Sequence, residues 1–165
     1  MLPGVQISCI FGYLKDLCIL LVWLNLYSRK IISWVLSETL EASHVVECVE
    51  KAKRVRNVEK PLIFHCDRGC QYVSEAFQKA TKGMIHSYSK KAYPWDNACI
   101  ESFHALLKRE WINRFKIFNY AHAHKLIFEY IETFYNTVRI HSHCGRRKTS
   151  RTHRTWNRSF CKEKS

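Results

Sequence analysis

Glycine, proline and acidic residues are scarce in this chain of 165 residues. Five glycines and three prolines leave little material for long linkers, so one domain is expected. Only 14 Asp and Glu residues stand against 27 Lys and Arg residues, which gives a formal net charge of +13. A chain this basic favours a polyanionic partner, with nucleic acid ahead of an anionic membrane surface. The hydrophobic fraction of 47% supports a packed core and argues against intrinsic disorder.

The sequence also lacks a long apolar run and a paired-cysteine motif. Its longest apolar run, residues 18–24, is shorter than the roughly 20 residues of a transmembrane helix, and no signal-peptide pattern is present. We therefore expect no membrane partner and, by default, a cytoplasmic location. The eight cysteines form no CxxC pair, which argues against a disulfide framework. A zinc site is an alternative of low weight, because the spacing matches no common zinc module. Its ligands would be His65, Cys66, Cys70, His141, His143 and Cys144.

Changes in hydrophobic period divide the chain into strands and helices. Three apolar stretches in the first third predict an antiparallel meander, with 12–16 as its first turn. Later stretches alternate between helical and strand periods, and Ser74 and Asp96 are candidate N-caps. Together they predict a mixed α/β domain. The expected strands are 5–11, 17–26, 31–36, 62–66 and 84–89, and the expected helices are 41–55, 74–82, 97–111 and 121–136.

The last two predicted helices carry apolar stripes at helical spacing. We expect Phe103 and Leu107 to be buried against the sheet, and Phe134 against the neighbouring helix. After residue 145 the chain is basic and aperiodic. We therefore expect one domain over residues 1–145 and a disordered or loosely attached tail over 146–165.

Two carboxylates stand at positions where chemistry is common. Asp67 follows a short buried strand and precedes Gly69, and ligand-binding groups collect at the carboxyl ends of such strands. A turn aspartate is the alternative. Glu101 lies beside the apolar stripe of its helix, with Lys108 on the same face about 10 Å along the axis. A solvated helix face is the alternative there.

Four strings in the sequence resemble the motifs of one family. Residues 65–72, HCDRGCQY, resemble H-S-D-x-G-x-Q-Y, and residues 95–103, WDNACIESF, resemble Y-D-N-A-x-x-E-S-F. Residues 26–34, LYSRKIISW, and 134–142, FYNTVRIHS, look like D-L-x-S-R-x-I-x-G-W and Y-N-x-x-R-x-H-S. With these motifs in order over roughly residues 5–145, the chain resembles the second-frame (OrfB) product of bacterial insertion-sequence transposases. The catalytic domain of that family is similar to retroviral integrase and has a ribonuclease-H-like fold.

The resemblance implies a fold, a chemistry and a set of residues. The fold would be a mixed sheet of about five strands flanked by helices. The family holds two Mg²⁺ or Mn²⁺ ions with Asp, Asp and Glu, and it nicks and joins DNA at element ends and targets. By motif position Asp67 is the second carboxylate and Glu101 the third. With the net charge, the cations around Glu101 predict DNA binding at Lys90, Lys91, Lys108 and Arg109.

The sequence departs from the family at the first carboxylate. Gln6 occupies that position, and an amide oxygen is a poorer magnesium ligand than a carboxylate. Asp16 is the only nearby acid and is a less suitable substitute. The spacing from Asp67 to Glu101 is shorter than in the family, and the chain begins almost on the first strand. We therefore expect a degenerate or truncated core with impaired catalysis. The alternative is an inactive domain that binds DNA, itself or an intact transposase.

Overall fold

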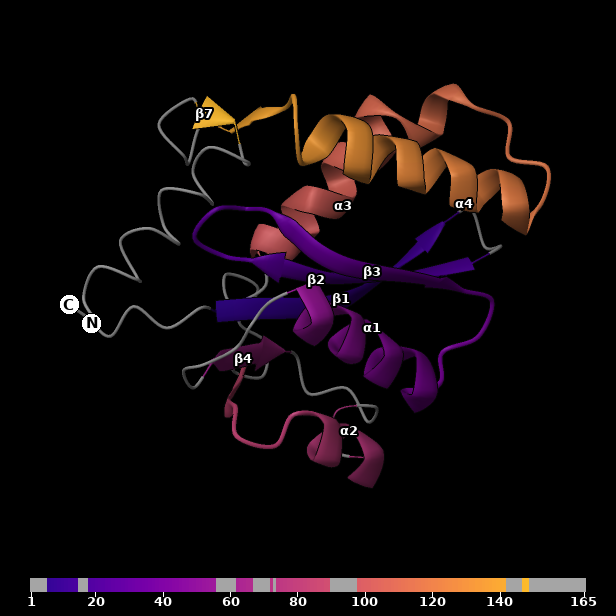
Figure 1. The fold of residues 1–165 in the computed structure, drawn as a ribbon. Helices are drawn as coiled ribbons and strands as arrows, with labels where there is room; N and C mark the ends of the chain where they lie inside the picture. Colours follow the sequence, from indigo (N-terminus) through magenta and orange to yellow (C-terminus); the bar gives the residue numbers. More distant parts are fainter. Residues whose placement is uncertain are drawn as a thin grey trace.

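The computed structural model of the protein describes the backbone of residues 6–14, 18–55, 62–66, 72, 74–89, 98–141 and 147–148, and the side chains of these residues apart from 6–14 and 147–148. Five strands form one mixed sheet in the order β3-β2-β1-β4-β5 (Figure 1). The first three are antiparallel neighbours, and β4 and β5 run parallel to β1. Their bounds are β1 Gln6–Leu14, β2 Cys18–Asn25, β3 Ile31–Ser37, β4 Ile63–Cys66 and β5 Ile85–Tyr88. The predicted mixed sheet and its antiparallel meander are confirmed.

The first strand is longer than its apolar pattern predicted. Gly12, Tyr13 and Leu14 were assigned to a turn, but they pair with β2 from Leu20 back to Cys18. That assignment is wrong because β2 begins only at Cys18, so its first residues still need partners across the ladder. The connection between β1 and β2 is therefore shorter than predicted and consists of residues 15–17. These residues include Asp16 and lie outside the described residues.

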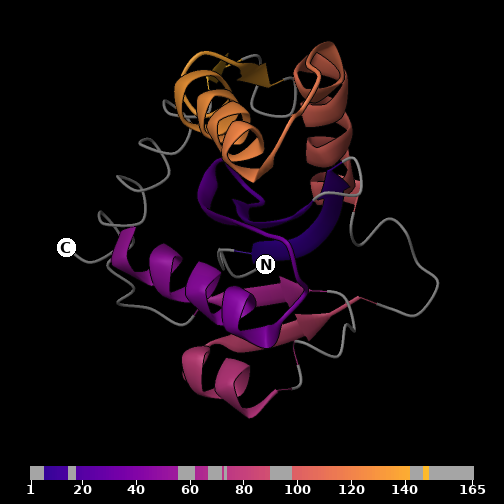
Figure 2. The same ribbon diagram turned by 90° about the vertical axis from the view of Figure 1, so that its right-hand side faces the viewer.

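Helices cover both faces of the sheet and give three layers. Figures 1 and 2 show α1 (Ala42–Val55) and α2 (Glu75–Ala80) on one face, and the later helices on the other. Those later helices are α3 (Ala98–Glu110), η3 (Ile112–Arg114), α4 (Tyr120–Phe128) and η4 (Glu129–Tyr135). A short hairpin of β6 (Ile140–His141) and β7 (Arg147–Lys148) stands apart from the sheet. The rest of the predicted tail lies outside the described residues.

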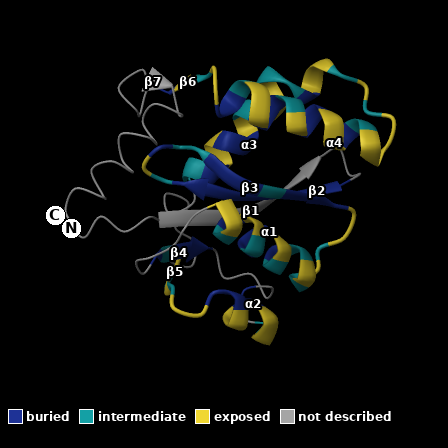
Figure 3. Ribbon diagram, in the orientation of Figure 1, coloured by how far each residue is buried: buried dark blue, intermediate teal, exposed yellow. Residues whose placement is uncertain are grey.

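The second strand divides the core into two halves. Leu21 and Trp23 pack with α1 and α2, whereas Leu20 and Val22 pack with α3 and the helices that follow it. This alternation is the two-residue period of a strand. Every residue of β2 is buried because both faces of the sheet are covered (Figure 3), which explains its continuous apolar run.

The last helix changes its winding midway. The prediction was one helix over 121–136, but α4 passes into the π-helix η4, closed by a bond from Asn136 N to Ile131 O of 3.0 Å. Wider π turns bring Tyr130 and Tyr135, five residues apart, to the same buried face. Asn136 then ends the helix and bonds both backbone groups of Ile31 at 3.0 Å, which fixes the start of β3.

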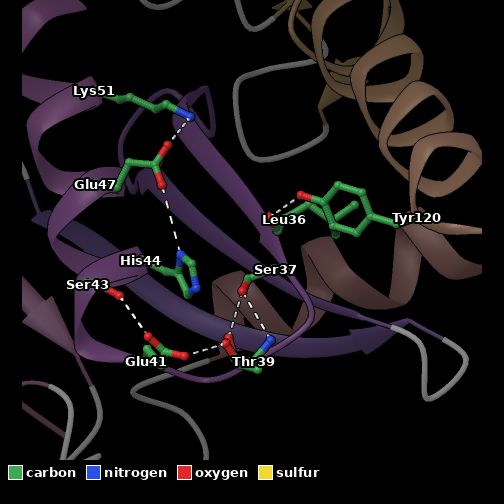
Figure 4. A network of polar contacts seen from close by, with 9 residues as sticks. All are labelled: Leu36, Ser37, Thr39, Glu41, Ser43, His44, Glu47, Lys51 and Tyr120. Carbon is green, nitrogen blue, oxygen red and sulfur yellow. Dashed lines mark hydrogen bonds and ion pairs between the residues drawn. The ribbon is translucent and has the colours of Figure 1, made fainter.

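Polar contacts at the edge of the sheet hold the start of α1 and of α4. Figure 4 shows Ser37 bonded to the backbone of Thr39, whose hydroxyl donates to Glu41 at 2.9 Å. On the other side Tyr120 Oη donates to the carbonyl of Leu36 at 2.6 Å. Because β3 is an edge strand, this hydroxyl satisfies a carbonyl near its end.

Candidate functional site

The third helix presents one carboxylate and two cations to solvent. Ile100, Phe103 and Leu107 are buried, as predicted for Phe103 and Leu107, while Glu101 in the first turn is exposed. Lys108 and Arg109 lie exposed in the last turn. A carboxylate near a helix amino end is stabilised by the helix dipole, and cations are stabilised near its carboxyl end. This flank of α3 is therefore open to a charged ligand.

The predicted partners of Glu101 lie partly outside the described residues. Asp67 directly follows Cys66, the last residue of β4, and its own placement is outside them. The same holds for Lys90 and Lys91, which follow β5. Among the described residues no group of three His, Cys, Asp or Glu side chains is arranged to hold a metal ion.

The pairing of β1 with β4 fixes where Gln6 lies. Gln6 is opposite Ile63, and Cys9 is opposite Cys66. Cys66, the residue before Asp67, is therefore paired with a residue three positions beyond Gln6. The position that corresponds to Asp67 is one further, at residue 10, and the rise along β1 from residue 6 to residue 10 is about 13 Å. In this register Gln6 lies near the start of β4, whereas Asp67 follows its end.

The first histidine of the zinc alternative has a structural role. The Nδ1 atom of His65 lies 3.1 Å from Ser87 Oγ, and its Nε2 atom lies 3.2 Å from Ser89 Oγ. Both ring nitrogens are therefore engaged by hydroxyls, and Cys66 packs in the core. His65 links β4 to β5 rather than presenting a nitrogen to a metal.

A pocket of 420 Å³ opens on the other flank of α3. Leu106, one of its lining residues, is about 140° round the helix from Glu101, which does not line it. The pocket walls come from the turn between β2 and β3, the first half of α3 and the segment from η4 to β6. Its lining residues are Arg29, Ala98, Cys99, Ser102, Phe103, Leu106, Tyr135, Arg139 and His141.

An ion pair supports the wall of this pocket. Arg139 binds Glu110 through two bonds, Nη2 to Oε1 at 2.7 Å and Nε to Oε2 at 3.0 Å, and Tyr130 Oη donates to the same carboxylate at 2.8 Å. The hydrogen bond from Arg139 lowers the pKa of Glu110, and burial together with Glu110 raises the pKa of Tyr130. Two-point binding of this kind fixes the guanidinium plane.

His141 lies buried beside these cations, at 6% exposure. Burial first, and then the charges of Arg139 and Arg29, lower its pKa to about 4, against an opposing effect of the Tyr135 carbonyl. The ring is therefore neutral at pH 7. Its Nδ1 atom is 3.4 Å from Arg139 Nη1. Nε2 has no well-aligned hydrogen-bond partner among the described residues.

This burial makes stability depend on pH. Because the folded pKa of about 4 lies below the unfolded value near ~6.5, protons bind the unfolded chain first as the pH falls. We expect His141 to account for a loss of about 2 kcal/mol in the free energy of unfolding between pH 7 and 4.5. Urea titrations at both pH values measure the loss, which should shrink by that amount in His141→Gln. An unchanged pH dependence in the variant would contradict it.

Two models of known protein families match this chain, and together they extend from residue 7 to residue 148. An integrase core domain model matches residues 7–96, and a second model of the same description matches residues 82–148. The chain belongs to the integrase core domain family. The matched ranges include β4 and α3, so the two candidate carboxylates stand within family sequence.

Curated relatives are transposases of bacterial insertion sequences. The transposase of insertion sequence element IS904 from Lactococcus lactis is 41% identical over 125 residues, which cover 74% of this chain and 49% of that protein. The InsF transposase of IS3A from Escherichia coli is 36% identical over 128 residues, 76% of this chain and 44% of that protein. The predicted resemblance to insertion-sequence transposases is confirmed. The integrase core chain spans about half the length of these relatives.

Solved structures show the same fold. The catalytic core domain of HTLV-2 integrase, solved with magnesium, superposes with a TM-score of 0.66 at 15% identity over 93% of this chain and 98% of that one. A chain of the simian T-cell lymphotropic virus intasome in complex with PP2A regulatory subunit B56 gamma gives a TM-score of 0.71 at 18% identity over 92% of this chain and 55% of that one. The predicted ribonuclease-H-like fold is confirmed. No helix among the described residues is long and apolar enough to cross a membrane.

The pocket residues were missed as a site by sequence reasoning. Arg29, Arg139 and His141 all stand in quoted family strings, 26–34 and 134–142. The strings are over 100 residues apart in sequence, and the Asn136–Ile31 bonds and the shared pocket show that they meet. The signal in the sequence was the place of these three residues in the family motifs, to which no role had been assigned.

Proposed function

We propose that this chain is the DNA-handling core of an insertion-sequence transposase whose catalysis is impaired. The observation that carries the proposal is the family match over a fold in which α3 presents Glu101, Lys108 and Arg109 together on an exposed surface. The net charge of +13 supports a DNA partner, as does the name of each curated relative. Its substrates would be element ends and target DNA in a bacterial cytoplasm, at the nucleoid.

The metal centre is the weak part of the site. Asp67 and Glu101 are the carboxylates that we propose for Mg²⁺ or Mn²⁺, which prefer oxygen ligands. The motif places Gln6 in the remaining ligand position, but the β1–β4 register sets it at the start of β4. Two ions about 4 Å apart need ligands that converge within a few ångströms. These residues therefore do not fit a three-carboxylate centre for two ions, and we assign no reaction step to it.

The second candidate function is a binding domain without catalysis. It would bind DNA through the same cations, or pair with a second copy or with an intact transposase. The missing first carboxylate favours this function, because DNA binding needs cations and not a metal centre. Nicking activity separates the two candidates, while DNA binding is common to both.

Salt titration tests the DNA proposal. We expect a duplex of arbitrary sequence to bind at low salt, with log K falling linearly against log salt at a slope of about −0.9 for each phosphate neutralised. Fluorescence anisotropy from low to moderate salt measures the slope. Replacing both Lys108 and Arg109 with Ala should weaken binding uniformly across sequences and reduce the slope by roughly one or two.

Lys82→Ala is the matched control. Lys82 is exposed next to α2, on the opposite face of the sheet from α3. Its replacement removes a charge without touching the proposed surface. The control removes one charge and the double variant removes two. If the control therefore weakens binding about half as much as the double variant does, the attraction is a property of net charge and α3 is not the interface. Absence of binding at low salt would overturn the function itself.

A further inference from the structure

The pocket on the flank of α3 away from Glu101 is lined by two arginines, and one of them has no counterion among the described residues. Arg29 is half-buried at its edge and forms no ion pair with any described residue. Arg139 is paired with Glu110, yet among the described residues its Nη1 atom makes only two long contacts of 3.4 Å. Ser102 adds an exposed hydroxyl. The arrangement leaves donors without strong acceptors around a hollow of 420 Å³.

The backbone at Arg29 is in an unfavourable conformation. Its φ of 59° lies in the left-handed region, and it is the one non-glycine residue with positive φ in the described part of the chain. Glycine or asparagine adopts this region at lower cost. The turn is held by Asn25, whose side chain accepts from Tyr27 N and Ser28 N at 3.0 Å each. Strain of this kind at a half-buried cation that lines a pocket suggests a role for the side chain.

The pocket is also preorganised by its other wall. Asn136 ties the end of η4 to Ile31, two residues after Arg29, through two bonds of 3.0 Å. The Glu110 carboxylate orients the Arg139 guanidinium at two points. His141 contributes a buried Nε2 atom without a hydrogen-bond partner among the described residues. Arg29 and Arg139 therefore line the same pocket, and Arg139 is already oriented before a ligand enters.

We propose that this pocket binds a phosphate group of the DNA backbone, held by Arg29 and Arg139 with Ser102 and the amino end of α3. The proposal rests on the proposed DNA function and adds a second contact area, separate from the Glu101 flank. Guanidinium groups and hydroxyls are the usual phosphate ligands, and a helix amino end favours an anion. A volume of 420 Å³ is within the roughly 300–1,000 Å³ of small-molecule sites, so a free phosphate ion can enter as well.

Arg29→Gly separates binding from folding. It removes the charge and relieves the backbone, so the variant should be as stable as the parent or more so. We expect its affinity for duplex DNA to fall about three- to tenfold at low salt, and its salt slope to shrink by about one. Inorganic phosphate at millimolar concentration should raise the thermal midpoint of the parent and not that of Arg29→Gly.

Two variants complete the test. Arg29→Lys should keep part of the affinity, because it keeps the charge but not the planar fork. Arg54 is an exposed cation at the end of α1. Arg54→Ala should leave DNA affinity and the phosphate response close to those of the parent. Equal loss in Arg54→Ala and Arg29→Gly would overturn the pocket as a site.

The outcomes distinguish this pocket from the wider function. If the parent binds DNA and Arg29→Gly binds it equally well, with the same salt slope, the pocket proposal is wrong and the DNA function stands. If DNA does not bind but phosphate stabilises the parent alone, the pocket holds a free phosphate and the DNA function is wrong. If neither DNA nor phosphate binds the parent, both proposals are overturned.

Discussion

Phe103→Ala is expected to lower the free energy of unfolding by roughly 3–5 kcal/mol. Phe103 is 1% exposed, and its ring lies 4.9 Å from that of Tyr135 in an edge-to-face contact. Truncation leaves a cavity between α3 and η4 that the π-helical turn cannot close without moving Tyr135. For a domain of this size the loss is a large share of total stability. Urea denaturation followed by circular dichroism measures the shift in midpoint.

Two other phenylalanine variants serve as comparisons for this result. Phe118 is 71% exposed in the loop before α4, and Phe118→Ala should change stability by less than about 0.5 kcal/mol. Phe134 is partly buried against the same cluster as Phe103, so Phe134→Ala should fall between the two. Equal midpoints for the Phe103 and Phe118 variants would mean that α3 does not pack on the sheet as described.

Much of the fold follows from local pattern in the sequence. The apolar run at residues 17–26 predicted a strand, and β2 is buried throughout. A strand covered on both faces has no polar side, which is why its sequence is continuously apolar. Ser74 was predicted to cap a helix, and its Oγ accepts from Phe77 N at 3.3 Å. In both cases the residue type and its immediate neighbours carry the information. Phe103 and Leu107 were placed inward by helical period for the same reason.

Features that depend on distant partners could not be read from the sequence. The extension of β1 to Leu14 depends on where β2 begins, and the π turns of η4 depend on fitting Tyr130 and Tyr135 against α3. The meeting of Arg29 with Arg139 needs the Asn136–Ile31 bonds across 105 positions of sequence. Such features are set by tertiary packing, which overrides local preference.

The placement of the candidate site is the case where motif and pairing disagree. Motif alignment puts the first carboxylate position at Gln6, whereas the ladder puts Cys9 opposite Cys66. A slip of four residues is even, so it keeps every residue of β1 on its own face of the sheet. The two-residue alternation of β1 is therefore compatible with both registers, and sequence periodicity alone cannot choose between them. A functional measurement can.

Nicking of supercoiled plasmid by this chain in magnesium is expected to be very slow or absent. Asp67 and Glu101 supply two negative charges, whereas two divalent ions bring four positive ones, so a second ion is poorly held. Metal ions contribute several kcal/mol of transition-state stabilisation, so loss of one should cost orders of magnitude in rate. Glu101 is exposed on α3, so Glu101→Gln should leave the fold intact. This variant should nick DNA no more slowly than the parent. Efficient nicking by the parent that Glu101→Gln abolishes would show that the centre is intact and that impaired catalysis is wrong.

Two added carboxylates then decide where the first metal ligand belongs. Gln6→Asp restores the acid at the motif position, and Ile10→Asp adds one just past the Cys9–Cys66 pair, as Asp67 is just past Cys66. We expect Gln6→Asp to tighten magnesium binding in calorimetric titration, because it restores a carboxylate at the motif position of the first ligand. Nicking should recover less than binding, because the short Asp67–Glu101 spacing leaves Glu101 off its best position. A gain in Ile10→Asp alone would mean that the observed register is the working one and that the motif alignment of Gln6 is wrong. If neither variant gains magnesium affinity, Asp67 and Glu101 do not form a metal site, and the chain acts on DNA by binding alone.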